Sequence, residues 1–376
     1  MKLTKFVLAL ALSVCGCNSE MTLVDGPVAT YEPELLRSVL SYLSETGNQP
    51  EQGDWPQDFG DANYYGPGFL FRYGNAGGNA AQIALAKENT TYNSNLIERA
   101  TTSFDVFYSR LEDVMMSGMG LIEAQAFKSD DMVSKRLEDL LNVLNLLSKT
   151  FEYYPSEEDL KSSYAAATYG PTTLNGTLAL MNLEYAYTAD GDDKEERVAT
   201  GLEILKYGDE KAFDEKLGYY RFSLTEEKLH LYPNVVQMLA HTRAYQLTEQ
   251  KKYLDRAQTL YAAIQPLKVK GEGRYRSPYS AKYMGAKTDD YTTLSSQNYT
   301  MMAFAVLYQV TGDKKLKEEV AQVLEFVRSH LFEGRRVLHH WMDGKIAQPS
   351  NPEFYCSGCN LQLLYVIWRL EDLLKE

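Results

Sequence analysis

The chain has 376 residues, a formal net charge of −13 at pH 7, 44% hydrophobic residues and 24% charged residues. Both fractions are near those of globular domains, so the composition excludes a wholly disordered chain and allows a large core. The acidic excess argues against a nucleic-acid partner and against binding of anionic lipid by a cluster of basic residues. The 28 tyrosines suit stacking on sugars, although amphipathic helices also place Tyr at the edge of a core.

The first 16 residues have the pattern of a cleaved signal peptide. Lys2 and Lys5 form a basic start, and the apolar run Phe6 to Val14 is far shorter than the roughly 20 residues of a membrane-spanning helix. The run ends in VCGC, which resembles the bacterial lipobox and predicts cleavage after Gly16 and diacylation of Cys17. One alternative is a register in which Cys15 carries the lipid. The other is an ordinary secretory signal peptide that is cleaved nearby.

Lipid on Cys17 would anchor the protein to a membrane. Each buried methylene contributes about 0.8 kcal/mol, so two acyl chains hold firmly where one does not. Residues 17–30 then form a tether and residues 31–376 a single domain. Asn18 follows the lipidated cysteine, and resemblance to enteric lipoproteins implies that a residue other than Asp there favours the outer membrane over the inner one. We therefore expect a lipid-anchored protein of the cell envelope.

A Gly- and Pro-rich stretch at residues 53–69 carries acidic and aromatic side chains together. Asp58 and Asp61 are candidate catalytic carboxylates, and Trp55 and Tyr65 are candidates for stacking on a sugar. Long aromatic loops in helical proteins are often functional. Aspartates in such loops also form turns or cap helices, which is the competing interpretation.

Amphipathic segments follow, and they predict helices. In the N-terminal half we expect helices over residues 31–43, 76–88, 94–116, 120–127 and 131–150.

The C-terminal half contains an internal repeat, with units that begin at Thr172, Leu231 and Ser295. Each unit predicts an apolar helix, a Y-x-x-T turn and a more charged amphipathic helix. Stacked hairpins must form a closed ring or an open solenoid to bury their faces. With a last helix over 358–375 paired with the first one, the chain has six hairpins. The Y-x-x-T turns are residues 185–188, 245–248 and 308–311.

Short stretches rich in Gly, aromatic and basic residues separate these hairpins. Their composition fits short hairpin strands or loops gathered at one end of the array. They are residues 215–223, 271–280 and 333–345.

Six hairpins of this size, with inner helices more apolar than outer ones, resemble the (α/α)6 toroid of the six-hairpin glycosidases, the sugar epimerases, and the unsaturated glucuronyl and rhamnogalacturonyl hydrolases. The resemblance covers about residues 31–376 and rests on periodicity and turn signatures, without a family catalytic motif. It implies an all-α ring with short loops or β-hairpins at one end. The alternatives are an open helical scaffold for protein partners and a two-domain helical bundle.

In such a ring, the starts of the inner helices and the loops before them line one mouth, where we expect a ligand. Arg276 and Trp341 from these loops would suit an acidic sugar, because guanidinium binds carboxylate in a bidentate manner. Amide side chains would hydrogen-bond a hydroxyl-rich ligand, although Asn is also a strong helix-capping residue. The amides at these helix starts are Asn175, Asn234, Gln297 and Asn298.

These features favour a carbohydrate-active protein, first of all a glycoside hydrolase acting on oligosaccharides that could contain uronates. Such an enzyme needs two carboxylates, about 5 Å apart for retention of configuration and further apart for inversion. Asp290, just before an inner helix, therefore joins Asp58 and Asp61 as a catalytic candidate. The alternative is a non-catalytic lipoprotein that binds glycan or a protein partner with the same concave face.

Cys356 and Cys359 form a CxxC motif. In an exported protein, a local disulfide or a pair of free thiols is favoured over a redox function and over metal binding. The motif supplies only two zinc ligands, and no nearby pair of histidines completes a site, so we expect no metal and no cofactor.

Overall fold

The computed structural model describes part of the chain. The described residues are 35, 38, 118, 121–122, 131–150, 170–188, 193–223, 228–277, 289–334, 337–338, 340–342, 345–346 and 357–374.

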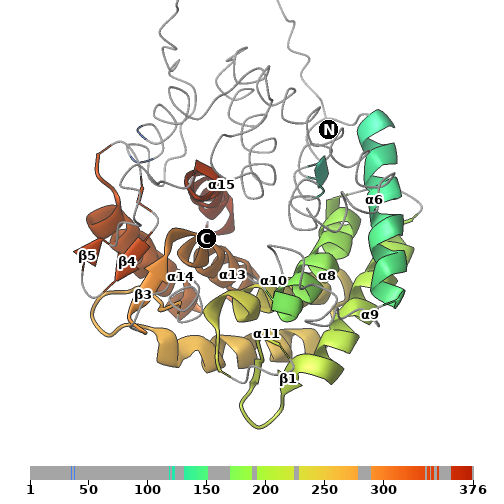
Figure 1. Ribbon diagram of the computed structural model, residues 1–376, viewed down its shortest axis with the longest axis horizontal. Coiled ribbons are helices and arrows are strands. Elements are labelled where there is room, and N and C mark those ends of the chain that lie inside the picture. The colour runs from blue at the N-terminus through green and yellow to red at the C-terminus, as the bar shows by residue number, and fades with distance from the viewer. Residues whose placement is uncertain are drawn as a thin grey trace, which may run out of the picture.

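Within this part of the chain, the helices form two concentric layers, with inner helices on the concave side of an arc and outer helices on the convex side (Figure 1). Adjacent inner helices pack on one another, and α8, α10 and α13 each also pack on the outer helix that follows in the chain. The inner helices are α8 (Gly170–Thr188), α10 (Leu231–Thr248), α13 (Leu294–Thr311) and α15 (Ser357–Leu373). The outer helices are α6 (Asp131–Thr150), α9 (Lys194–Ala212), α11 (Lys251–Ile264) and α14 (Lys314–Phe326).

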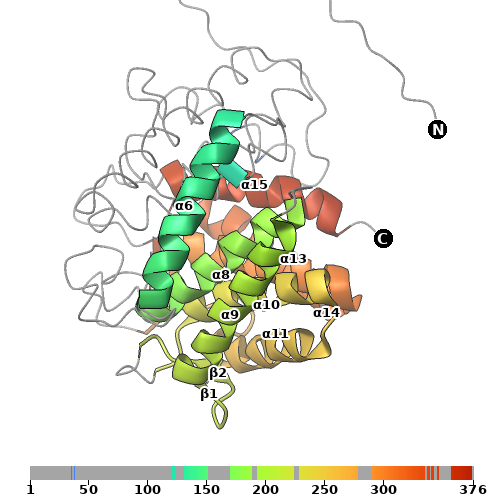
Figure 2. The ribbon, with the colours of Figure 1, turned by 90° about the vertical axis from the view of Figure 1, so that its right-hand side faces the viewer.

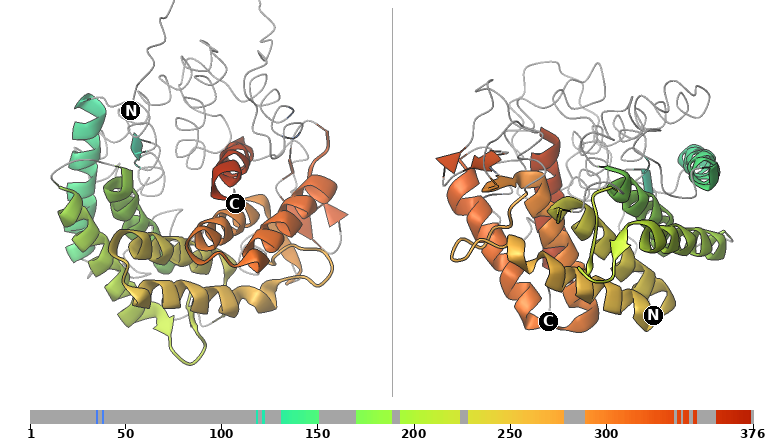
Figure 3. Two further views of the ribbon diagram at one scale, coloured as in Figure 1. Left: turned by 180° about the vertical axis from the view of Figure 1, so that it is seen from behind. Right: turned by 60° about the horizontal axis from the view of Figure 1, so that its bottom comes forward.

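Inner and outer helices differ in sequence because they are buried differently. An inner helix touches outer helices on one side and the other inner helices around the axis, so it is apolar nearly all round. In α13, for example, Met301 and Phe304 are both fully buried. An outer helix buries one stripe, as α14 does with Val320 and Val323, and turns its lysines outward. The two layers are also visible from the side and from behind (Figures 2 and 3).

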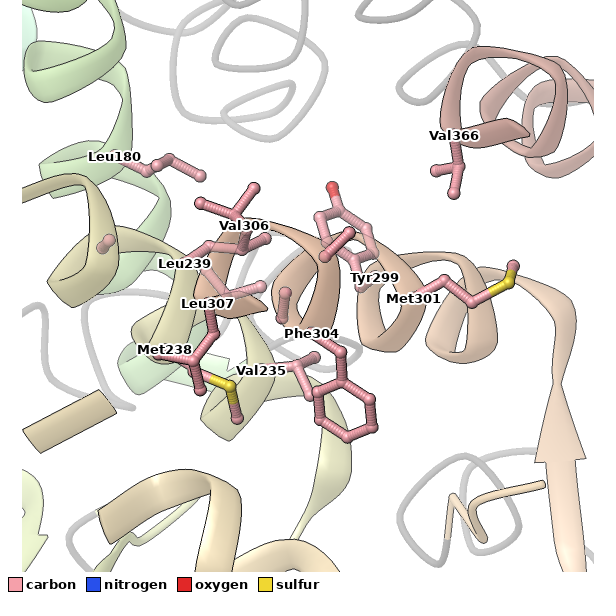
Figure 4. Packing of buried hydrophobic residues seen from close by; sticks show 14 of the residues in the cluster. Leu180, Val235, Met238, Leu239, Tyr299, Met301, Phe304, Val306, Leu307 and Val366 are labelled. Atoms are coloured by element: carbon pink, nitrogen blue, oxygen red, sulfur yellow. The ribbon is translucent and has the colours of Figure 1, made fainter. Parts of the chain in front are cut away.

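Apolar contacts between adjacent inner helices hold the arc together. Val235 and Met238 of α10 lie beside Phe304 and Leu307 of α13, and all four belong to one continuous core (Figure 4). Leu35, from the first predicted helix, belongs to the same core.

The inner helices α8, α10 and α13 end at their Y-x-x-T motifs, as the repeat predicts. In α13 the Thr311 hydroxyl donates to the Leu307 carbonyl at 2.8 Å. Gly312 then takes a left-handed conformation, with φ of 68°, and its N–H donates to the Tyr308 carbonyl at 2.7 Å. This left-handed C-cap reverses the chain into the outer helix. Thr188 and Thr248 make the same bond to the preceding helical turn in α8 and α10.

The segments between hairpins form short strands at the N-terminal ends of the inner helices, which is one of the two forms expected of them. β1 (Phe213–Asp214) and β2 (Tyr219–Tyr220) form a hairpin before α10. In a second sheet, β4 pairs with both β3 and β5, so the segments before α13 and α15 are tied together. The strands of this sheet are β3 (Tyr291–Thr293), β4 (His340–Met342) and β5 (Lys345–Ile346).

Two short irregular segments complete the described elements. A 3₁₀ turn, η1 (Gln265–Leu267), follows α11, and a π-helical turn, η2 (Val327–Leu331), follows α14. None of the helices described here is long and apolar enough to cross a membrane.

The helix predictions agree with the structure where it describes them. The helix expected over residues 131–150 is α6, and the repeat units contain α8 to α14. The observed α15 begins and ends close to the expected 358–375. Leu35, Leu121 and Ile122 are helical, within two further predicted helices. The helices expected over 76–88 and 94–116 lie outside the described residues.

Candidate functional site

The amides at the starts of the inner helices bind main chain. Asn234 accepts from the Tyr220 N–H at 2.8 Å and donates to the Tyr220 carbonyl at 3.0 Å. Gln297 holds the N–H and carbonyl of Tyr275 in the same way, at 3.0 and 2.9 Å. Both amides are 0% exposed. The role in sugar binding predicted for Asn234 and Gln297 is therefore corrected to a structural one, because the strand segment before each helix occupies their hydrogen-bonding groups.

The two other predicted amides are also engaged inside the protein. Asn175 donates to the Ile204 carbonyl at 3.0 Å and accepts from the Gln237 amide at 3.0 Å. This joins α8 to α9 and α10, so Asn175 is corrected to a structural role as well. Asn298 donates to the Cys359 carbonyl and to the Gln362 amide oxygen, at 2.9 and 3.0 Å.

The fold positions Asp290 at the mouth, directly before β3. Its carboxylate accepts from the Arg274 guanidinium at 2.7 Å, and its side chain is 34% exposed. Arg274 is itself buried and also bonds Glu272. The adjacent Asp289 is 68% exposed and pairs with Lys228 at 2.9 Å, which lowers the pKa of Asp289. Of the two adjacent carboxylates, Asp290 is thus the one anchored from the interior, and its catalytic role stays a prediction.

The predicted loop residues Arg276 and Trp341 lie against the protein. Arg276 donates to the Pro266 carbonyl at 2.9 Å. Trp341 is 8% exposed and packs edge-on against Phe326 and His330, with ring centroids 5.7 and 5.1 Å away. Trp341 is therefore a core residue of the β3–β4 region, which corrects its predicted role as a sugar platform.

The structure also bears on the cysteines and on metal binding. Cys359, at the start of α15, is disulfide-bonded. Within the described ranges, no group of three His, Cys, Asp or Glu side chains could hold a metal ion. The predicted residues outside these ranges are Cys17, Trp55, Asp58, Asp61, Tyr65 and Cys356.

Side chains from the four described inner helices surround a narrow hollow on the axis of the arc, called here the lumen. Its volume is about 30 Å³, enough for water but not for a sugar ring. Figure 4 shows the Tyr299 ring of α13 directed into the space between Leu180 of α8 and Val366 of α15. The polar and charged residues that line it are Glu184, Arg243, Asn298, Tyr299, Gln362, Tyr365 and Arg369.

Two polar groups in the lumen have defined geometry. Arg243 donates to Glu184 at 2.9 Å and to Gln246 at 2.6 Å, and its guanidinium lies 3.7 Å from the ring centroid of Tyr187. The remaining terminal nitrogen of Arg243 has no acceptor among the described residues. The buried Asn298 carbonyl oxygen likewise has no donor there. The lumen therefore offers a hydrogen-bond donor and an acceptor that the described protein groups do not use.

Apart from Asn298, sequence reasoning missed the polar residues of the lumen, because it followed helix starts rather than helix faces. Glu184 follows Leu180, and Arg243 follows Leu239, by one helical turn, and all four line the lumen. The available signal was a charged side chain recurring at helical spacing on an otherwise apolar inner helix.

No known protein-family model matches this sequence, and no curated protein matches it. Solved structures do match. Cellobiose 2-epimerase from Bacillus thermoamylovorans aligns with a TM-score of 0.64 and 12% identity, over 91% of this chain and 98% of the other. A glycosyl hydrolase of family 88 from Bacteroides vulgatus gives 0.63 and 12%, over 91% and 99%.

A third match is an inactive variant of an α-1,6-mannanase from a Salegentibacter species, with two adjacent aspartates replaced and α-1,6-mannotriose bound. Its TM-score is 0.61 at 13% identity, over 90% of this chain and 99% of the other. The chain has the (α/α)6-toroid fold. The toroid resembles that of the six-hairpin glycosidase-like enzymes over nearly its full length, and at these identities the likeness establishes the fold alone.

Proposed function

We propose that the protein is a lipid-anchored, carbohydrate-active enzyme, a glycoside hydrolase that acts on oligosaccharides at the mouth of the toroid. The observation that carries this proposal is the lumen, where tyrosine, amide and guanidinium groups from α10, α13 and α15 converge with the Glu184 carboxylate of α8. Such groups recognise hydroxyl-rich ligands. Since the lumen holds only water-sized molecules, it serves as the floor of the site, and the sugar binds above it at the mouth.

An acidic sugar fits the charges of the lumen. Arg243 is fixed by Glu184 and by the face of Tyr187, and it keeps one terminal nitrogen for a ligand. Arg369 adds a second guanidinium to the same lining. A uronate carboxylate would complete this arrangement by a charge-assisted hydrogen bond.

Hydrolysis requires two carboxylates on either side of the glycosidic bond. Asp290 is anchored at the mouth by Arg274, and the loop residues Asp58 and Asp61 are the candidates for its partner. The mannanase with the same fold is inactive when two adjacent aspartates are replaced. Asp290 also has an adjacent aspartate, Asp289, but only Asp290 is bonded to a buried arginine, so Asp290 is tested first and Asp289 serves for comparison.

Turnover of an oligosaccharide panel tests the proposal. The panel includes α-1,6-mannotriose and uronate-containing oligosaccharides, and the variants are Asp58→Asn and Asp290→Asn. Loss of a general acid, base or nucleophile should lower kcat by at least about 100-fold. Asp289→Asn is the matched control, because this exposed neighbour pairs only with Lys228 in the contacts described.

Unchanged turnover in both Asp58→Asn and Asp290→Asn would contradict the choice of catalytic residues. Saturable oligosaccharide binding by the unmodified chain without release of products would instead support the alternative, a glycan-binding lipoprotein that uses the same mouth.

A further inference from the structure

A second pocket lies on the outer face of the toroid, between the outer helices α9 and α11 and the back of the inner helix α10. Its volume is about 350 Å³, within the range of small-molecule sites and far larger than the lumen. Helix α10 separates the two, because its Arg243 lines the lumen while its His241 lines this pocket. We call it the outer pocket.

Cationic groups in the outer pocket remain available to a ligand. The Lys252 ammonium lies 4.7 Å from the ring centroid of Tyr253 and forms no ion pair with any described residue. Arg256 uses one nitrogen on Asp209, at 3.3 Å, and another on Glu215, at 3.2 Å. Its third nitrogen has no acceptor among the described residues. In a chain with a net charge of −13, two converging cations with unused donors indicate an anionic ligand group.

The floor of the outer pocket is a fixed polar network. The Tyr220 hydroxyl donates to Asp209 and lies 2.7 Å from the His241 Nε2 atom. Because the single hydroxyl proton is used on Asp209, Nε2 carries the proton of a neutral imidazole and donates to Tyr220. Burial, together with the charge of Arg256, lowers the pKa of His241 to about 3, which keeps the ring neutral. The network therefore holds the Asp209 carboxylate in place without adding a positive charge at His241.

The acidic residues of the outer pocket narrow the class of ligand. Glu203 and Asp209 line it beside Lys206, Lys252 and Arg256. A compact dianion such as phosphate would be repelled by both carboxylates. A molecule with one carboxylate and several hydroxyl donors satisfies all the groups, since its hydroxyls can donate to the acidic side chains.

We propose that the outer pocket binds a small hydroxylated carboxylate, the chemical class of the sugar acids. The ligand carboxylate binds the Lys252 ammonium and the unused Arg256 nitrogen, and ligand hydroxyls donate to Glu203 and to the second oxygen of Asp209. This site is separate from the mouth and does not depend on the proposed hydrolysis.

Calorimetric titration of the full chain tests this site with D-glucuronate, D-glucose and inorganic phosphate as probes. Glucuronate should bind saturably. Glucose lacks the carboxylate and phosphate lacks the sugar hydroxyls, so each should bind at least about tenfold more weakly. Lys252→Met should weaken glucuronate binding by about tenfold or more. Lys251→Met is the matched control, since this neighbouring lysine pairs with Asp255 at 3.0 Å instead.

A separate variant distinguishes the outer pocket from the lumen. Arg243→Met removes the lumen guanidinium, and glucuronate binding to the outer pocket should survive it. The proposal is overturned if Lys252→Met binds glucuronate as the unmodified chain does, if glucose or phosphate binds equally well, or if Arg243→Met alone abolishes the binding. Turnover in Lys252→Met should be unchanged, so failure here leaves the proposed hydrolase untouched.

Discussion

Asn234, Gln297 and Asn360 occupy the fourth position of three inner helices and make the same pair of hydrogen bonds. Each amide binds both the N–H and the carbonyl of one residue in the segment before its helix, at 2.8 to 3.0 Å. An amide is the side chain that can donate and accept at once, which explains its recurrence. Sequence alone could not separate this role from sugar binding, because the bonded partner lies 14 to 23 residues away.

Replacing Gln297 with Ala should therefore destabilise the fold strongly. It leaves the buried N–H of Tyr275 unpaired, while the Tyr275 carbonyl keeps a bond from the Thr292 hydroxyl at 3.2 Å. An unpaired buried group costs about 1–3 kcal/mol, so we expect the free energy of unfolding, measured by urea denaturation, to fall by about that amount. Gln309→Ala, at an exposed position of the same helix, should change it by less than about 0.5 kcal/mol. Equal effects of the two variants would contradict the structural role.

The neutral, buried His241 should make stability depend on pH. Its folded pKa of about 3 lies below the unfolded value near 6.5, so only the unfolded chain gains this proton as the pH falls from 6.5 towards 3. The free energy of unfolding should then decrease by up to about 1.4 kcal/mol per pH unit. Burial raises the pKa of Asp209 in the folded chain. At the acid end of this window, protonation of Asp209 therefore favours the folded state and offsets part of the decrease.

His241→Gln isolates this contribution, because Gln has no proton to gain and can still donate to Tyr220. The urea stability of the unmodified chain should fall by about 2 kcal/mol more than that of the variant between pH 7 and pH 5. Gln309→Ala, an exposed change that removes no ionisable group, is the control and should keep the pH dependence of the unmodified chain. Parallel pH profiles for His241→Gln and the unmodified chain would be inconsistent with a neutral His241.

At the scale of elements, the turn that follows η1 depends on a glycine. Gly273 has φ of +78°, and an added Cβ would lie 2.6 Å from the Gln322 carbonyl oxygen on α14. Gly271, two residues earlier in the same turn, has φ of +85° and nothing within 4 Å of such a Cβ. Both positions favour glycine by conformation, but only Gly273 also requires it for close approach to the outer helix.

The two alanine variants should separate these effects. Gly271→Ala carries only the left-handed backbone penalty of about 1–2 kcal/mol. Gly273→Ala should destabilise by clearly more, because the turn must also move away from α14. Thermal unfolding of both variants measures the difference directly. A Gly271→Ala variant as damaged as Gly273→Ala would mean that the contact with α14 adds nothing.

The helices could be predicted from sequence because their signals are local. Amphipathic periodicity located α6 at its observed bounds, and each Y-x-x-T motif ended an inner helix through bonds within one helical turn. The composition of the segments between hairpins left strands and loops undecided. Pairing such as Thr292 with Trp341 joins segments from different repeats, and no local pattern specifies it.

At the scale of the whole molecule, the sites are assembled from distant helices. The lumen takes its side chains from four inner helices, and the outer pocket joins Asp209, His241 and Arg256 from three successive helices. None of these sets forms a sequence motif, since their order in space depends on closing hairpins into a ring. The repeat therefore predicted the fold, whereas the polar groups inside it became visible only in three dimensions.

The proposed lipid anchor concerns the whole molecule, because it would decide where the toroid works. We expect the chain, expressed in a Gram-negative host, to incorporate an alkyne-labelled fatty acid and to sediment with the outer membrane. Cys17→Ala removes the acylated thiol, and with it the acyl chains at about 0.8 kcal/mol per buried methylene, so the label and the membrane association should both be lost. Cys15→Ala is the matched control and should keep both. Labelling that survives Cys17→Ala but not Cys15→Ala would place the anchor in the rival register, and labelling that survives both substitutions would contradict a lipid on either cysteine.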